Sequence, residues 1–276
     1  MDRQASLSWR GTGFTDTGLA RQTNQDTFVV DNDLGLWIVA DGMGGHAGGE
    51  TASQLAVKAV TDHLASAAIS FPDFHNQIDQ VEGLLRSAVA AADSLIRATA
   101  DTTPDLKGMG TTIVIGLFCP GAEPSIALAH IGDSRAYLIR DRCINALTTD
   151  HSFVQRLVSE GRISHDEART HPQQNVLLRA LGVEDRLPPD VTIHSLHPHD
   201  IVMLCTDGLT KMLEEQDILD YVLTFQQSPE EMCRQLIGAA NARGGKDNTT
   251  VIVIAPTEQT AAPHNTQNEP PAGVFP

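Results

Sequence analysis

The hydrophobic positions along the chain recur with two different periods, so the sequence predicts both strands and helices. Short apolar or β-branched runs bounded by turn-forming residues such as Gly, Asn, Asp and Pro are typical of strands. Such runs predict strands over 6–15, 27–31, 36–41, 111–118, 125–131, 135–140, 144–147, 201–205 and 249–255. Apolar residues at three- and four-residue intervals are typical of helices. They predict helices from about Gly49, and over 81–99, 153–160, 214–225 and 229–243.

Short connections separate most of the predicted strands, which favours antiparallel sheets. We expect an antiparallel opening from the first three strands and an antiparallel meander between residues 111 and 147. Asp150 or Thr149 is expected to cap the helix that begins at Phe153. Residues 161–186 are polar and irregular, which indicates a mobile insert. Residues 256–276 lack apolar periodicity and are rich in Ala, Pro, Thr, Asn and Gln, which predicts a disordered tail.

Composition and charge narrow the classes of protein to which the chain belongs. It has 276 residues, 41% hydrophobic and 20% charged, which suits one large globular domain or two small ones. Its net charge of -16 would repel nucleic acid and anionic membranes, so we expect neither as a partner. The first ten residues lack the apolar core of a signal peptide, and no apolar run approaches a membrane span. We therefore expect a cytoplasmic protein.

The four cysteines are widely separated in the sequence and form no C-x-x-C pair. A zinc knuckle and a thiol redox motif are therefore both excluded by their spacing. We expect buried, reduced thiols at Cys119, Cys143, Cys205 and Cys233.

The first candidate for chemistry is Asp41, where an apolar run leads directly into a glycine-rich stretch. Gly42-x-Gly44-x-x-Ala47 also fits the dinucleotide-binding fingerprint, but a pyrophosphate there would lie beside the Asp41 carboxylate. A tight Asp-Gly turn without any chemistry is a further interpretation. We favour a metal centre, because glycine lets the backbone come close to whatever the carboxylate binds.

Two more acids lie against the ends of apolar β segments, namely Asp207 and Asp247. If neighbouring strands bring them to Asp41, three carboxylates without a counter-charge would destabilise the fold, so divalent cations are expected among them. Oxygen ligands favour Mg²⁺ or Mn²⁺. A pair of such ions can activate a bridging water against a phosphate ester. Arg21 is the candidate for binding two phosphate oxygens at once.

The motifs of the chain, taken together, resemble those of the PP2C-type (PPM) protein serine/threonine phosphatases in their bacterial form. The resemblance covers about residues 10–255, and the motifs occur in the order typical of the family. They are Arg21-x-x-Asn24-Gln25-Asp26, Asp41-Gly42-Met43-Gly44-Gly45-His46, Gly110-Thr111-Thr112, Gly132-Asp133-Ser134-Arg135, Asp150-His151-Ser152, Arg179-Ala180-Leu181-Gly182, Thr206-Asp207-Gly208-Leu209 and Asp247-Asn248.

This resemblance implies an α+β fold, a four-layer α/β/β/α sandwich with two central antiparallel sheets. It implies one phosphatase domain over residues 6–255, in which 161–186 is a flap that influences substrate choice. It also implies a binuclear Mn²⁺ or Mg²⁺ site at one end of the sandwich. There, Asp41 would bridge both ions, and the Gly42 carbonyl, Asp207 and Asp247 would complete the protein ligands.

The remaining site residues are also assigned by the resemblance. Arg21 would hold the substrate phosphate, Asp26 would orient metal-bound water, and Asp133 would help to bind a third, weaker metal ion. In animal members a histidine that is thought to protonate the leaving group follows the Asp-Gly pair. Here Met43 occupies that position, which leaves His46 or a metal-bound water as the proton donor.

We therefore expect a metal-dependent phosphatase that hydrolyses phosphoserine and phosphothreonine in proteins by water attack, without a phosphoenzyme. The alternative is a PP2C-like pseudophosphatase that binds phosphoproteins without hydrolysing them. The expected partners are phosphorylated proteins, including a serine/threonine kinase or its targets, and the expected state is a monomer. Lys211 stands where some members have a further acid, and its charge disfavours tight binding of a third metal ion.

Overall fold

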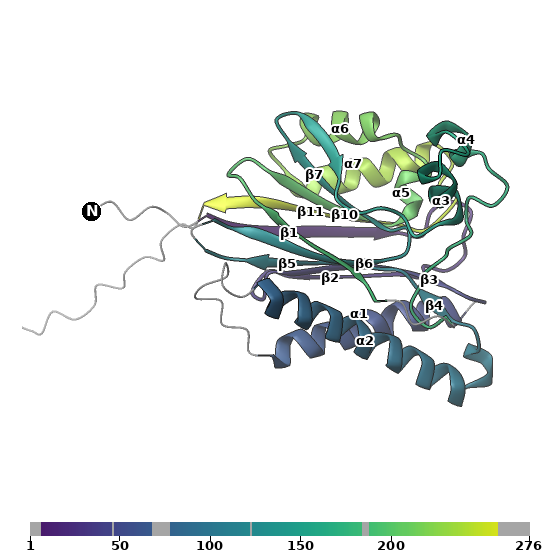
Figure 1. Cartoon of the computed structure of the whole chain (residues 1–276). Coiled ribbons are helices and arrows are strands. Elements are labelled where there is room, and N and C mark those ends of the chain that lie inside the picture. The colour runs from purple at the N-terminus through teal and green to yellow at the C-terminus, as the bar shows by residue number, and fades with distance from the viewer. Residues whose placement is uncertain (1–6, 46, 68–77, 122, 184–187, 259–276) are drawn as a thin grey trace, which may run out of the picture.

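Two antiparallel sheets lie face to face, with helices covering the outer face of each (Figure 1). The computed structural model describes residues 7–45, 47–67, 78–121, 123–183 and 188–258. This arrangement confirms the predicted four-layer α/β/β/α sandwich. Among these residues, none of the helices combines the length and the apolar character needed to cross a bilayer.

The first sheet has the strand order β1-β11-β10-β7-β8. Its strands are β1 (Leu7–Asp16), β11 (Thr249–Glu258), β10 (Ile201–Cys205), β7 (Arg135–Arg140) and β8 (Cys143–Ala146). Its outer face is covered by α5 (Asp207–Thr210), α6 (Glu215–Thr224) and α7 (Pro229–Ala242). Apolar side chains of these helices form one buried cluster with those of β7, β10 and β11.

The second sheet has the order β2-β3-β5-β6-β9, and β4 pairs with the C-terminal end of β3. Its strands are β2 (Asp26–Asp31), β3 (Leu36–Met43), β4 (Gly110–Thr111), β5 (Ile113–Cys119), β6 (Ser125–Ile131) and β9 (Asp190–Ser195). Two long helices, α1 (Gly48–Ser66) and α2 (Ile78–Thr102), cover its outer face, and a 3₁₀ turn η2 (Pro104–Leu106) follows α2.

The central strands are buried on both faces, which explains why they are continuous apolar runs rather than alternating ones. Residues 36–40 of β3 are all fully buried. Their side chains alternate between the helix-facing cluster, with Leu36 and Ile38, and the cluster between the sheets, with Trp37 and Val39. A side chain at Gly11 would bring its Cβ within 2.3 Å of the Trp37 indole, so glycine at this position lets the two sheets pack closely.

Two predictions about strand pairing were wrong, because pairing partners are not encoded in the local pattern. β1 does not continue the β2–β3 hairpin, since it pairs with β11 in the other sheet. The predicted meander is divided as well, since β5 and β6 pair in one sheet and β7 and β8 in the other. The chain crosses between sheets at Gly132, where φ is +113° and an added Cβ would lie 2.5 Å from Thr112.

The other differences between the predicted and the observed elements are local. Ser152, not Asp150 or Thr149, caps α3 (Phe153–Ser159), and its side chain accepts a hydrogen bond from the Gln155 amide. The expected insert contains a helix, α4 (His165–Arg169), and β9 follows it unpredicted. β11 extends to Glu258, beyond the expected start of the tail. Residues 259–276 lie outside the described part of the chain.

The cysteine prediction holds for three of the four side chains. Cys119, Cys205 and Cys233 are buried and free, whereas Cys143 in β8 is exposed. Burial raises the pKa of each buried thiol to about 12, so these groups stay protonated near neutral pH.

Candidate metal centre

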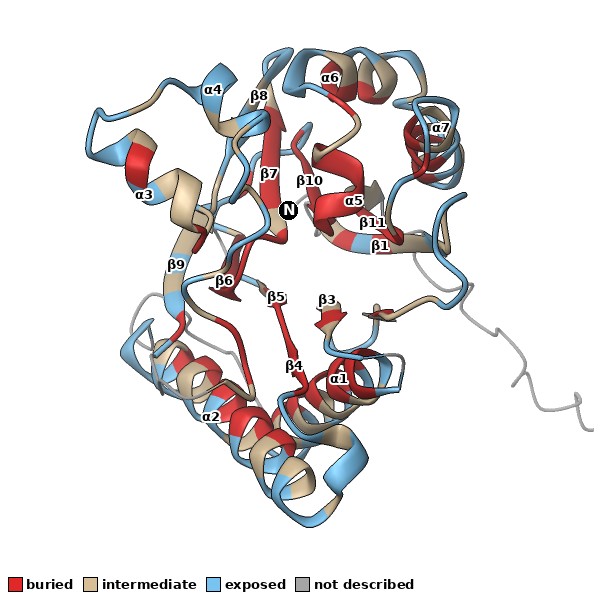
Figure 2. Ribbon diagram, turned by 90° about the vertical axis from the view of Figure 1, so that its right-hand side faces the viewer, coloured by how far each residue is buried: buried red, intermediate tan, exposed pale blue. Residues whose placement is uncertain are grey.

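The three acids selected from the sequence meet at one end of the sandwich. The elements β3 and α5, which carry two of them, face the viewer in Figure 2. Asp41 comes from β3, Asp207 is the first residue of α5 after β10, and Asp247 precedes β11. All three line one cavity of about 230 Å³. Arg21 and Asp133 line it too. Segments up to 226 positions apart (247 minus 21) therefore share one site.

Two earlier alternatives for Asp41 are excluded by this geometry. Asp41 and Gly42 lie within β3, which continues to Met43, so they do not form a tight turn. Every strand pair in the described part of the chain is antiparallel, whereas a dinucleotide-binding unit is built on parallel strands.

Threonines of the neighbouring strands fix the backbone of Asp41. Its amide donates to the Thr112 hydroxyl at 3.0 Å. Its carbonyl accepts from the Thr112 amide and the Thr111 hydroxyl, each at 2.9 Å. Gly42 donates in turn to the Gln25 carbonyl at 3.1 Å. A Cβ on Gly42 would lie 2.0 Å from the Gly49 carbonyl, so the start of α1 packs directly on this strand.

Asp26 lies directly across β2 and β3 from Asp41, and it links the two sheets. The hydroxyls of Thr206, directly after β10, and of Thr250, in β11 of the other sheet, donate to its Oδ2 at 2.8 and 2.7 Å. Its Oδ1 is buried and has no hydrogen-bond partner among the described residues. Burial raises the pKa of Asp26 to about 7 despite the two hydroxyl donors.

The electrostatics of the cluster are those of a cation site. Burial, and then Asp26, Asp207, Asp133 and Asp247, raise the pKa of Asp41 well above its usual value. Burial, followed by Asp207, likewise raises the pKa of Asp133. Asp207 Oδ1 is another buried oxygen without a hydrogen-bond partner in the described chain. Unpartnered carboxylate oxygens with no nitrogen or sulfur ligand among them fit Mn²⁺ or Mg²⁺.

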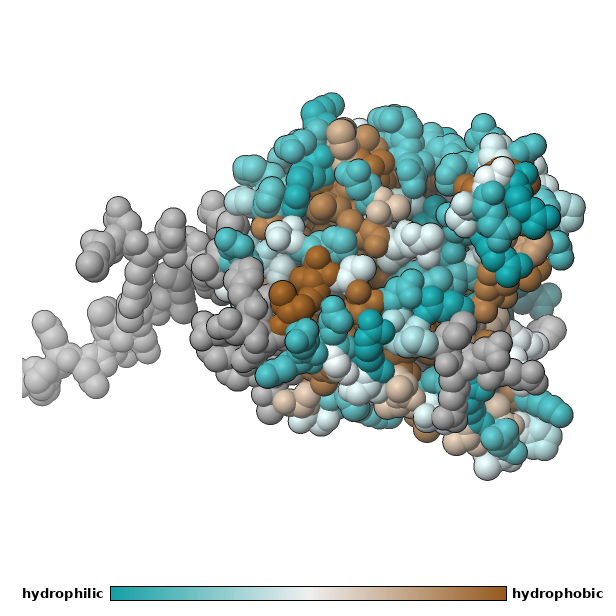
Figure 3. Space-filling model, in the orientation of Figure 1, coloured by the Kyte–Doolittle hydropathy of each residue, from teal (hydrophilic) through white to brown (hydrophobic). Residues whose placement is uncertain are grey.

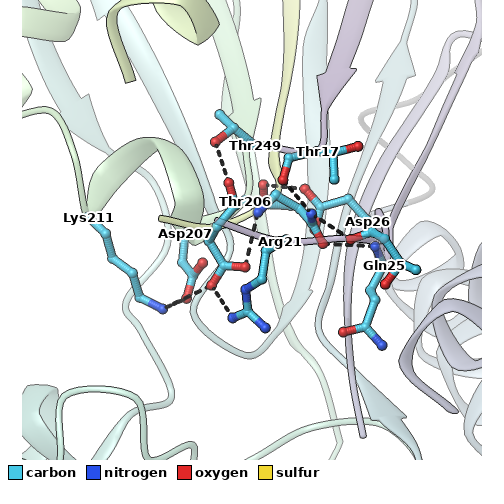
Figure 4. Close-up of polar contacts among 11 residues, drawn as sticks. Thr17, Arg21, Gln25, Asp26, Thr206, Asp207, Lys211 and Thr249 are labelled. Carbon is cyan, nitrogen blue, oxygen red and sulfur yellow. Dashed lines mark hydrogen bonds and ion pairs between the residues drawn. The ribbon is translucent and has the colours of Figure 1, made fainter. Parts of the chain in front are cut away.

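Two cationic side chains reach the acids from the rim (Figure 4). Arg21 Nη2 lies 2.8 Å from Asp247 Oδ2, and its side chain is half exposed. Lys211 contacts the Asp207 carboxylate, and its Nζ is 4.0 Å from Asp247 Oδ2. Although burial acts to lower it, the pKa of Lys211 is raised by Asp207, with smaller effects from Asp133 and Asp247.

Asn248 fixes the loop that carries Arg21, a role that the sequence motif did not disclose. Its Oδ1 accepts from the Gln25 amide at 2.8 Å. Its Nδ2 donates to the carbonyls of Thr17 and Thr23 at 2.9 and 3.0 Å. The Arg21 loop is thus tied at both ends to the residue that follows Asp247.

The segment 161–186 also contributes to the site. Asn175 and Leu177 line the metal cavity. Hydrogen bonds hold the base of this segment, from the Phe153 amide to the Val176 carbonyl at 2.8 Å and from the Leu178 amide to the His151 carbonyl at 2.7 Å. His46, expected as a proton donor, lies outside the described residues.

A second group of side chains that could ligate a metal lies next to Gly132, and the sequence analysis missed it. Ligand atoms of His130, His151 and Asp190 lie within 4.8 Å of one another, which makes them a candidate metal site. Here Arg179 provides the positive charge, at 2.9 Å from Asp190 Oδ1 and 2.8 Å from His151 Nε2. The Gly132 amide donates to His151 Nδ1 at 3.1 Å, so the group also fixes the turn that carries Asp133.

The fold and the acidic centre together define a metal-dependent phosphatase of the PP2C type, and comparison with known proteins shows the family. Residues 11–242 match the family model described as protein phosphatase 2C. The chain therefore belongs to the PP2C family and is a metal-dependent serine/threonine protein phosphatase.

Its relatives are bacterial. It is 36% identical to the serine/threonine phosphatase Stp of Listeria welshimeri, over 87% of this chain and 93% of that protein. It is 39% identical to PstP of Mycobacterium tuberculosis over 91% of this chain, which spans 45% of that longer protein.

Solved structures agree with this relationship. The catalytic domain of PstP in complex with two manganese ions matches with a TM-score of 0.77 at 36% identity, over 91% of this chain and 99% of that one. Stp1 of Staphylococcus aureus matches with a TM-score of 0.80 at 34% identity, over 92% and 98% of the two chains.

Proposed function

We propose that this chain hydrolyses phosphoserine and phosphothreonine in proteins, and that Asp41, the Gly42 carbonyl, Asp207 and Asp247 hold two Mn²⁺ or Mg²⁺ ions for this purpose. The observation that carries the proposal is the meeting of three carboxylates from distant segments around one cavity, with Arg21 on its rim. When bound, the ions would supply an activated water and neutralise charge on the phosphoryl group, without a phosphoenzyme.

The residues of the chain have distinct parts in this reaction. Asp41, across from Asp26 and between the other acids, would bridge the two ions. Asp26 Oδ1, which is buried and unpartnered, would accept a hydrogen bond and orient the attacking water. One nitrogen of the Arg21 guanidinium donates to Asp247, and its other N–H groups could donate to two phosphate oxygens.

Two further assignments complete the proposal. Asp133 would bind a third, weaker ion, because it lies in the same cavity and its carboxylate interacts with that of Asp207. Lys211 opposes this third ion with its own charge. His46 is proposed as the donor of a proton to the leaving hydroxyl.

The partners follow from this reaction. We expect phosphorylated proteins as substrates, including a serine/threonine kinase or the targets of one. We expect the chain to act as a cytoplasmic monomer. Its charge of -16 disfavours nucleic acid and anionic membranes as partners.

Hydrolysis of p-nitrophenyl phosphate tests the proposal. With Mn²⁺ the parent protein should release nitrophenol, and both EDTA and the Asp207→Ala substitution should abolish the release. Asp220→Ala, which removes an exposed carboxylate of α6 that does not line the cavity, serves as the control and should leave the rate unchanged. A parent that binds phosphopeptides but releases no nitrophenol with any metal would instead be a pseudophosphatase.

A further inference from the structure

A groove of about 520 Å³ lies beside the metal centre, between the helices α3 and α4 on one side and α5 and α6 on the other. Asp133 and Asp207 line both this groove and the metal cavity, so the two are continuous. Figure 2 shows these walls, with α3 and α4 to the left of β7 and α5 and α6 to its right. Where Figure 1 draws α3 and α4, the surface in Figure 3 is largely hydrophilic.

The charges on the floor of the groove cancel one another. Arg135 holds both carboxylate oxygens of Asp150, from Nε at 2.7 Å and from Nη2 at 2.8 Å. Its third nitrogen donates to the Tyr137 hydroxyl at 2.9 Å. Arg135, Asp150 and Tyr137 therefore give the groove polar groups but no net charge.

One pair of charges on the outer rim cancels in the same way. Arg169 of α4 lies 2.9 Å from the carboxylate of Glu214, at the start of α6. This ion pair joins the two walls across the groove. The groove is thus a preformed channel with one end at the metal centre.

Away from the end at the metal centre, where Asp133, Asp207 and Lys211 lie, two acids of the lining have no counter-charge among the described residues. Asp166 of α4 and Glu215 of α6 are exposed, and neither forms an ion pair with a residue that the structure describes. Each lies in the first turn of its helix, where a carboxylate is stabilised by the helix dipole. That effect accounts for an acid in each helix, but not for two that line the same groove from opposite walls.

We propose that this groove binds the residues next to the phosphorylated serine or threonine of a substrate, and that Asp166 and Glu215 select arginine or lysine there. The inference rests on the proposed phosphatase function, because the groove opens at the site where the phosphate would bind. A substrate side chain carrying a positive charge would meet two carboxylates that form no ion pair with the residues that the structure describes. An acidic neighbour would be repelled by the same two groups.

Phosphothreonine peptides that differ only in the flanking residues, arginine, alanine or glutamate, test this proposal with the Mn²⁺-loaded protein. We expect kcat/KM to be about tenfold higher for the arginine peptide than for the glutamate peptide, as two exposed charge pairs allow. The double variant Asp166→Asn/Glu215→Gln should lose this preference while it hydrolyses p-nitrophenyl phosphate, which is too small to reach the groove, at the parent rate.

The control is the double variant Asp101→Asn/Asp220→Asn, which changes the net charge equally at exposed positions outside the groove. It should keep the preference for arginine. The proposal is overturned if the parent shows no preference, if the groove variant keeps it, or if the control loses it, since the last result would indicate steering by the overall charge. Thermal unfolding of each variant checks that the helices are intact.

Equilibrium binding of the same peptides, with a non-hydrolysable phosphonate in place of the phosphate group, separates this inference from the phosphatase function. If the parent prefers the arginine phosphonate but hydrolyses nothing, the groove is supported and the catalytic proposal fails. If hydrolysis occurs with equal binding of all peptides, the catalytic proposal stands and the groove is refuted.

Discussion

Asp26 and Asp41 face each other as the last residue pair of the β2–β3 hairpin, and Asp41 lines the metal cavity. Two acids opposite each other in adjacent strands repel. Here burial raises the pKa of Asp26 to about 7 and, with the surrounding acids, raises that of Asp41 well above its usual value. The pair is therefore compatible with a stable fold only when protons or cations neutralise it.

In the metal-free protein, Asp26→Asn should increase stability at high pH. A carboxyl group whose pKa rises from 3.8 to about 7 on folding contributes stability below pH 3.8, and this contribution is lost as the pH rises through 7. Asparagine does not ionise, so it removes that loss. Its side-chain oxygen can still accept hydrogen bonds from the hydroxyls of Thr206 and Thr250. We expect the free energy of unfolding in EDTA at pH 8 to increase by about 1–3 kcal/mol, with little change at pH 4.

Urea denaturation of the parent and Asp26→Asn at both pH values measures this effect. Asp220→Asn, an exposed α6 variant, should behave as the parent. A variant less stable than the parent at pH 8 would show that the buried acid carries no penalty.

Arg21→Lys should impair hydrolysis although it keeps the charge. Lysine cannot place two parallel donors on a phosphate, so kcat/KM for a phosphopeptide should fall about 10- to 100-fold. Mn²⁺ affinity, measured by calorimetry, should not decrease, because Arg21 is a cation beside Asp247 rather than a ligand. If Arg21→Lys matches the parent in kcat/KM, two-point binding of the phosphate is wrong.

Lys211→Met should strengthen metal binding. The ammonium contacts Asp207 and lies 4.0 Å from Asp247 Oδ2, so it competes electrostatically with each incoming ion. We expect calorimetry to show about tenfold tighter Mn²⁺ binding. Lys58→Met removes a cation that pairs with Asp62 on α1, and it provides the control. Weaker Mn²⁺ binding by Lys211→Met would mean that the lysine organises the acids instead.

His130 should make the protein less stable in mild acid. Burial, and then the neighbouring His151, lower the pKa of His130 to about 4, so the unfolded chain takes up a proton below pH 6.5 that the folded protein excludes. The stability that neutral His130 contributes is fully present above pH 6.5, and it is lost as the pH falls toward 4. Between pH 7 and pH 5 the parent should lose about 2 kcal/mol more than His130→Phe, as measured by urea denaturation. Parallel losses in the two proteins would contradict this.

The sequence predicts elements and site residues well where the signal is local. Residues 36–40 form a continuous apolar run because both faces of β3 are buried, and the acids that lie at the ends of such runs are those that meet in the cavity. Pairing is different, because it depends on distant segments. Nothing in residues 7–16 indicates that β1 pairs with β11 rather than with β2.

The supporting residues of the site were harder to find for the same reason. Thr206 and Thr250 bind Asp26 across two sheets, and their sequence separation hides the contact. Arg179 and Asp190 both contact His151, although they lie 28 and 39 positions from it in the sequence. The groove likewise depends on α4, a five-residue helix whose Ser164–Glu167 capping box was the available local signal.

The number of Mn²⁺ ions bound per chain tests the central claim most directly. Native mass spectrometry of the parent and of Asp207→Asn, each at saturating Mn²⁺, gives that number. The account predicts at least two ions in the parent and the loss of at least one in Asp207→Asn. Equal metal content in both proteins would contradict the claim that these distant acids together form the metal centre.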